Sequence, residues 1–147
     1  MLKKISFVFF FFFTVVSLFA QQEINTDKKG LAVDGYDVVA YFDAKVLEGR
    51  KKYKVKVKGV AYQFSSEENL QKFKKNPNKF IPQYGGWCAY AIAVKNQKVP
   101  VNPKTFEIRD GKLYLFYNAW GTNTLKLWKD EGAEKLRQQA DENWSKE

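Results

Sequence analysis

The chain has a single cysteine, Cys88, among its 147 residues, and it has no histidine. One cysteine cannot form a disulfide within the chain, so the folded state must be held together by side-chain packing. Hydrophobic residues make up 45% of the sequence, and a chain of this length has room for one well-developed core. We therefore expect a domain built around a hydrophobic core and not around a disulfide framework.

The first twenty residues have the pattern of a secretory signal peptide. Lys3 and Lys4 form a positive start, a phenylalanine-rich apolar run follows, and Ala20 offers a small residue for cleavage. The run is shorter than the roughly 20 apolar residues that a spanning helix needs. The sequence thus predicts a signal peptide over residues 1–20 and an exported protein, periplasmic or secreted.

The rest of the chain has the organisation of one domain. Residues 21–30 are polar without periodicity, which favours a flexible lead-in, and the domain is expected over residues 31–147. Loss of Lys3 and Lys4 would lower the formal charge from +9 to +7. The lysines at 54–58 alternate with valines, as on the solvated face of a strand. We therefore expect no nucleic-acid partner, and an exported basic protein would more readily contact an anionic membrane surface.

Strands and turns are indicated by β-branched and aromatic runs with glycines between them. Asp110 and Gly111 form the strongest hairpin signal, and Gly59 marks a second hairpin. The predicted strands are residues 37–42, 53–58, 60–64, 105–109 and 112–117.

Helices are indicated by caps and by apolar spacing. Ser65 with Glu68 has capping-box spacing and predicts a helix over about 66–75 with Ser65 as its cap, and Asn76–Pro77 could open a second short turn. Residues 87–91 suit either a helix start or a strand, and the C-terminus is predicted helical with a break at Gly132. Strands followed by helices, without βαβ alternation, indicate an α+β fold: a small single domain with antiparallel hairpins packed against short helices.

Several linked motifs resemble the YHS domain family, small modules that are also found attached to metal-handling proteins. The match rests on VKGVAYQFSSEENLQKFKKNPNKF and PQYGGWCAYA, with LAVDGYDVVAYF near the start and DGKLYLFYN and ADENW near the end. The sequence is most similar to the secreted single-domain branch of that family. The resemblance implies the family's fold over most of residues 31–144.

The chain departs from the family at the metal ligands. Metal-handling YHS domains carry cysteines before and after the start of the helix, but here Ser65 and Asn69 stand at the second pair and Val38 and Val39 near the first. Zn²⁺ and Cu⁺ favour thiolate, imidazole and thioether ligands, and past the signal only Cys88 supplies one. We therefore predict no metal site and no resident cofactor.

Catalytic patterns are also missing from the sequence. Without histidine, the usual base for a serine or cysteine nucleophile is absent, and no phosphate loop or dinucleotide fingerprint is present. We therefore expect a protein that is not an enzyme.

Aromatic residues around the glycines of the matched motifs are the candidate ligand-binding residues. Cys88 is expected to be a buried structural residue; the alternative is a thiol at the mouth of an aromatic pocket that ligates haem iron or reacts with a partner. The favoured function is an accessory module that binds a small ligand or an envelope protein, and the alternative is a haem- or metal-binding redox protein that uses Cys88 or a nearby tyrosine. The candidate site residues are Tyr36, Tyr41, Tyr84, Trp87, Cys88 and Tyr90.

Overall fold

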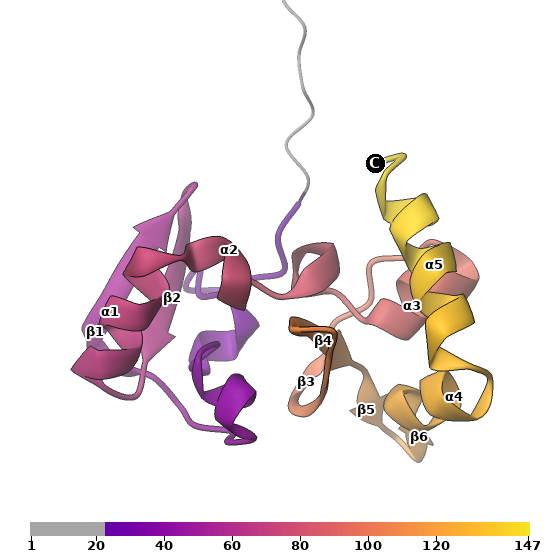
Figure 1. Cartoon of the computed structure of the whole chain (residues 1–147), viewed down its shortest axis with the longest axis horizontal. Helices are drawn as coiled ribbons and strands as arrows, with labels where there is room; N and C mark the ends of the chain where they lie inside the picture. Colours follow the sequence, from indigo (N-terminus) through magenta and orange to yellow (C-terminus); the bar gives the residue numbers. More distant parts are fainter. Residues whose placement is uncertain (1–22) are drawn as a thin grey trace, which may run out of the picture.

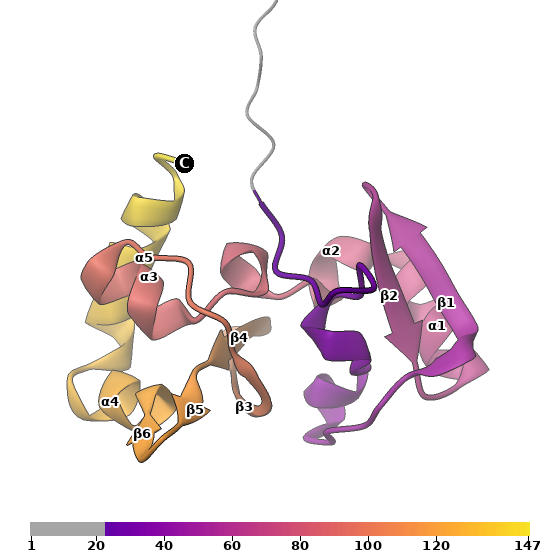
Figure 2. The same ribbon diagram turned by 180° about the vertical axis from the view of Figure 1, so that it is seen from behind.

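Two groups of elements lie on either side of a central β-hairpin (Figures 1 and 2). The computed structural model describes residues 23–147, so the predicted signal peptide lies outside the described residues. The central hairpin pairs β3 (Asn102–Arg109) with β4 (Lys112–Phe116). Antiparallel hairpins with short helices around them confirm the predicted α+β class.

The N-terminal group is a hairpin with a helix packed against it. Strands β1 (Arg50–Val57) and β2 (Val60–Phe64) are antiparallel, with Val57 opposite Val60 across the predicted Gly59 turn. Helices α1 (Glu67–Lys75) and α2 (Pro77–Phe80) follow, and the second begins at a proline as expected. Phe73 of α1 contacts Tyr62 and Phe64 of β2 with ring centroids 4.9 Å apart in each pair, which fixes the helix on the hairpin.

The cap of α1 differs from the prediction by one residue. Ser66, and not Ser65, occupies the cap, where its hydroxyl accepts a hydrogen bond from the Asn69 backbone N–H at 3.2 Å. Glu68 pairs with Lys72 one turn later, so it does not close a capping box. The Ser65 hydroxyl donates instead to the Asp37 carboxylate at 2.7 Å. The prediction failed because Ser65 and Ser66 are both suitable helix caps by local sequence. The hydrogen bond from Ser65 to the distant Asp37 leaves Ser66 as the cap.

The strand predicted over residues 37–42 is wrong. This stretch leads into a 3₁₀ helix, Ala40–Asp43, because the Asp37 carboxylate accepts the backbone N–H groups of Val39 and Ala40. A side chain that bonds its own backbone two residues on bends the chain, in competition with strand pairing. Val38 and Val39 are still buried, as their apolar character indicated.

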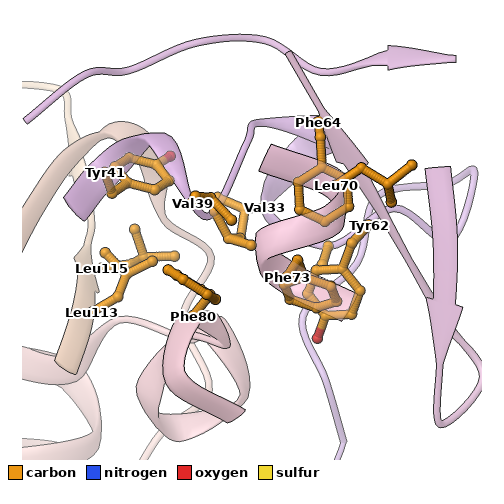
Figure 3. Packing of buried hydrophobic residues seen from close by; sticks show 12 residues of the cluster. Val33, Val39, Tyr41, Tyr62, Phe64, Leu70, Phe73, Phe80, Leu113 and Leu115 are labelled. Carbon is orange, nitrogen blue, oxygen red and sulfur yellow. The ribbon is translucent and has the colours of Figure 1, made fainter. Parts of the chain in front are cut away.

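The central strand β4 contributes to two separate cores. Leu113 and Leu115 pack in the N-terminal core with Phe64 and Phe73 of β2 and α1 (Figure 3). Tyr114 and Phe116 alternate with them and belong to the C-terminal core. Because successive strand side chains point to opposite faces, β4 is a wall shared by both cores.

The C-terminal group is mainly helical. It contains α3 (Ala89–Lys95), the two-residue strands β5 (Asn118–Ala119) and β6 (Thr122–Asn123), α4 (Thr124–Asp130) and α5 (Ala133–Trp144). Helices α4 and α5 are separated at Gly132, as predicted, where φ is +103°. Residues 89–95 are helical, which decides the question that the sequence left open. Trp128 of α4 is fully buried between Tyr114 and Phe116.

The structure departs from the expected flexible lead-in over residues 23–30. The Asn25 backbone N–H donates to the Gly85 carbonyl at 2.9 Å, and the Trp87 indole N–H donates to the Glu23 carbonyl at 3.0 Å. A Cβ on Gly85 would lie 2.8 Å from the Glu23 carbonyl oxygen, so only glycine permits this close approach. Polar composition gave no sign of these backbone contacts.

Candidate functional site

An apolar pocket lies between α3 and α4 and encloses about 370 Å³. Helix α3 supplies one wall. Cys88, Ala91 and Val94 are three residues apart, so they lie on the same face of the helix. Leu127 of α4 and Val99 of the loop after α3 contribute further apolar surface. The lining residues are Cys88, Tyr90, Ala91, Val94, Lys95, Val99, Tyr117, Thr122, Thr124 and Leu127.

Cys88 lies at the start of α3 and is completely buried, which confirms the expected burial. The Thr124 hydroxyl donates its hydrogen to the Tyr117 carbonyl at 2.8 Å. It is therefore left to accept from the Cys88 thiol, whose Sγ lies 3.3 Å away. Sγ in turn accepts the Tyr117 backbone N–H at 3.4 Å. The thiol thus both donates and accepts, and it joins α3, α4 and the end of β4 at the base of the pocket.

Two further polar side chains of the lining, Tyr90 and Lys95, are more exposed than Cys88 and Thr124. The Tyr90 hydroxyl donates to the Glu131 carboxylate at 2.8 Å, and this hydrogen bond, followed by burial, raises the pKa of Tyr90. Lys95 is the one charged residue in the lining. An apolar cavity with a single cation at its rim favours an apolar ligand with an anionic end.

Tyr84 and Trp87 lie outside this pocket. Tyr84 is buried against α5, where its hydroxyl donates to Asp141 at 2.8 Å, and burial together with this bond raises its pKa. It borders a second cavity of about 350 Å³ near Trp144. Trp87 is half-buried with its indole N–H on the Glu23 carbonyl. Of the four candidates in residues 84–90, Cys88 and Tyr90 share the α3–α4 pocket.

Tyr36 and Tyr41 lie in the N-terminal group. Tyr41 is buried in its core, and the hydroxyl donates to the Pro103 carbonyl at 2.7 Å. Burial raises the pKa of Tyr41. Tyr36 is partly exposed, and its hydroxyl approaches Glu48 at 3.4 Å. Neither residue borders the α3–α4 pocket, so the structure does not bring all six candidates into one site.

The side chains of Ser65 and Asn69 belong to a hydrogen-bond network around Asp37. One carboxylate oxygen of this buried residue accepts the Ser65 N–H, the Ser65 hydroxyl and the Asn69 side-chain amide at 2.7–2.8 Å. The other oxygen accepts two backbone N–H groups. These oxygen and amide groups already bond one another, and no soft donor is among them, so they do not fit a Zn²⁺ or Cu⁺ ion.

Several residues of the pocket were missed by the sequence analysis. Tyr117 and Thr124 lie 29 and 36 residues from Cys88, and no shared motif links them to it. The apolar spacing of Ala91 and Val94 would have indicated a helix face, but only after residues 89–95 were identified as helical. Leu127 falls in the helical C-terminal pattern and has no feature that distinguishes it from a core residue.

Residues 23–147 contain neither a cluster of metal ligands nor a helix that could span a membrane. No cluster of three or more cysteine, aspartate or glutamate side chains that could hold a metal ion occurs in this part of the chain. None of the helices described there has the length and apolar character that crossing a bilayer requires.

Comparison with known proteins gives one match. Residues 38–84 match the sequence model of the YHS domain. No curated protein and no solved structure matches the chain. The matched stretch includes β1, β2, α1 and α2 and ends before Cys88, so the α3–α4 pocket lies beyond it.

Proposed function

The chain carries a YHS domain over residues 38–84, and on that premise we propose that it is a non-catalytic binding module that holds a small ligand in the α3–α4 pocket. The observation that carries the proposal is a cavity of about 370 Å³ with mostly apolar walls. This volume falls within the range of small-molecule sites in proteins. The family match suggests a metal-related role, but the donors around Asp37 do not support one.

The single lysine of the lining narrows the class of ligand. Ala91, Val94 and Leu127 would contact an apolar body, and Lys95 at the rim would pair with a carboxylate, sulfonate or phosphate end. Tyr90 is held by Glu131, so it is positioned to pack its ring and not to change protonation state. A ligand of this kind needs no reacting group, which agrees with the expected lack of enzyme activity.

The test is titration with anilinonaphthalene sulfonate, an apolar dye with one negative charge. We expect saturable binding of one dye per chain, with fluorescence enhancement. Val94 is 36% exposed at the pocket, and Val94→Trp should fill the mouth and weaken binding at least tenfold. Leu47→Trp is the matched control, because Leu47 is similarly exposed, at 41%, and borders neither of the two cavities described above.

Charge selectivity adds a second readout. Lys95→Glu should weaken the anionic dye more than a neutral dye of similar size, such as Nile red. Circular dichroism and urea unfolding establish that each variant is folded. Equal affinity of the wild type and Val94→Trp for the anionic dye would contradict the proposal.

Haem or metal binding through Cys88 stays a prediction for the alternative function. The thiol donates a hydrogen bond to Thr124 and accepts one from the Tyr117 N–H, so ligation as a thiolate would lose the bond to Thr124. An absorption spectrum of the purified protein is the direct test: a Soret band that is lost in Cys88→Ala would favour this alternative.

A further inference from the structure

The turn between β5 and β6 has an unusual residue at its tip. Three two-residue hairpin turns in the described residues have positive φ at both positions, and each ends in glycine: Lys58–Gly59, Asp110–Gly111 and Trp120–Gly121. Such turns favour asparagine, aspartate or glycine at the first position. Trp120, with φ of +52°, is a bulky residue in a conformation that bulky residues rarely adopt.

Trp120 gains no packing in return for this strain. Its side chain is 96% exposed, whereas the next most exposed large hydrophobic residues of the described chain are Leu47 at 41% and Val94 at 36%. Trp128, by contrast, is fully buried. A strained and fully exposed tryptophan stabilises neither the hairpin nor a core, so its contribution is expected to come from outside the folded chain.

Several lysines lie on the elements that neighbour this turn. Lys104 lies between Asn102 and Thr105, both of which bond Asn118 of β5. Lys95 borders the α3–α4 pocket together with Thr122 of β6, and Lys126 and Lys129 lie on α4, which follows β6 directly. Lys126 pairs with Asp130, and the Glu131 carboxylate accepts the Tyr90 hydroxyl, so Lys95, Lys104 and Lys129 are the lysines of this group that form no ion pair within the described residues.

We propose that the β5–β6 turn docks the protein on an anionic membrane surface by inserting Trp120 among the lipid headgroups. Tryptophan is enriched at membrane–water interfaces because its apolar ring and polar N–H suit the headgroup level. These neighbouring lysines would pair with lipid phosphates. A single projecting ring with lysines on the neighbouring elements fits a headgroup layer better than a protein pocket, which would need complementary acids and a larger apolar patch. The inference does not depend on the ligand of the α3–α4 pocket.

The test compares the wild type with Trp120→Asn, in the same processed form, on vesicles of phosphatidylcholine with 30% phosphatidylglycerol. Asparagine accepts the positive φ of this position, so the hairpin should persist and the urea midpoint should not fall. We expect at least fivefold weaker co-sedimentation of Trp120→Asn. Binding of the wild type should also weaken as salt rises and on vesicles of phosphatidylcholine alone.

Brominated lipids give a readout specific to the tip. Bromine on the acyl chains should quench part of the wild-type tryptophan fluorescence, and the quenched part should be missing in Trp120→Asn. Leu47→Asn, a change at another exposed apolar residue, should bind as the wild type does. Unchanged partition and quenching in Trp120→Asn would overturn the proposal. Failure of the wild type to bind either vesicle would also overturn it and would leave a protein partner as the occupant of the tip.

Discussion

Asp37 and Cys88 are fully buried polar side chains, and neighbouring groups meet the hydrogen-bonding capacity of each. Asp37 accepts five hydrogen bonds from backbone and side-chain donors on two segments of the chain. Cys88 bonds Thr124 and Tyr117 from two further segments. Each residue therefore ties together stretches that are distant in sequence.

We predict that Asp37→Asn strongly destabilises the fold. The new amide keeps the shape of the carboxylate but places an N–H₂ group against donors that need an acceptor. Leaving buried donors without partners costs about 1–3 kcal/mol each, and more where a charged acceptor is lost, so unfolding should become easier by about 2–4 kcal/mol in urea titration. Asp43→Asn, at an exposed position, is the control and should change stability little. A loss below 0.5 kcal/mol in Asp37→Asn would show that the network contributes little.

For Cys88 we predict that serine replaces the residue better than alanine does. Cys88→Ala removes Sγ and leaves the N–H of the half-buried Tyr117 without its acceptor, which should cost about 1–3 kcal/mol. The Cys88→Ser hydroxyl has both partners of the thiol within reach, so it should cost less. Urea unfolding of both variants provides the ranking. A serine variant less stable than the alanine variant would contradict the hydrogen-bond pattern.

The thiol should also react slowly in the native state. Maleimide labelling beside a denatured control measures this directly, because buried thiols are shielded from reagents. Labelling at the denatured rate would contradict the observed burial.

At the scale of elements, helix α1 is set by a cap that only the structure identifies. Ser66→Ala should cost about 1 kcal/mol, the usual effect of losing a serine N-cap, because the Asn69 N–H loses its acceptor. Ser65→Ala should cost a similar amount for another reason, the loss of a bond to Asp37. The Asp37→Asn background separates the two, since the effect of Ser65→Ala should shrink there while that of Ser66→Ala stays. Equal effects in both backgrounds would argue against the assignment.

The elements also show what local sequence can and cannot predict. Both predicted hairpins are present in the structure. Gly59 and Gly111 each occupy the second position of a two-residue turn with positive φ, a conformation that glycine adopts without strain. Residues 37–42 were misassigned because their β-branched character was outweighed by side-chain bonds from Asp37, whose other partners are 28 and 32 residues away. In the site, Cys88 and Tyr90 were found by their place after the glycines. Thr124 and Leu127 were not, because tertiary packing alone brings α4 to α3.

At the scale of the whole molecule, the YHS match covers only part of a folding unit. Residues 38–84 supply most of the N-terminal core, but Leu113 and Leu115 come from β4. We therefore predict that a fragment of residues 31–84 does not fold alone. Its circular dichroism should show a disordered chain, while the full chain unfolds in one cooperative transition. A cooperative thermal transition in the fragment would contradict the shared-wall arrangement.

Alkaline pH should weaken the fold through its buried tyrosines. Burial raises the pKa of Tyr62 to about 12, whereas the unfolded phenol ionises near pH 10. Between these values the unfolded state holds fewer protons, so stability that is fully present below pH 10 is lost as pH rises toward 12. At pH 11 the loss from this group is about 1.4 kcal/mol.

Tyr62→Phe tests this effect, because it removes the ionising group and keeps the ring. The fall in unfolding free energy between pH 9 and pH 11 should be smaller in this variant by about 1.4 kcal/mol. Tyr53→Phe, at a partly exposed ring of the same half, is the control. An identical fall in Tyr62→Phe and the wild type would count against the effect.

The two-faced burial of β4 has a consequence for the chain before it folds. A strand with one solvent-exposed face alternates apolar and polar residues. In β4 and the residue after it, five consecutive side chains are apolar or aromatic, from Leu113 to Tyr117. This run has no charge and no proline, which is the composition of segments that assemble into cross-β aggregates when exposed. Lys112 and Asn118 stand at its ends as polar gatekeepers. While the chain is still unfolded this segment is exposed, so slow folding would favour self-association of the protein through residues 113–117.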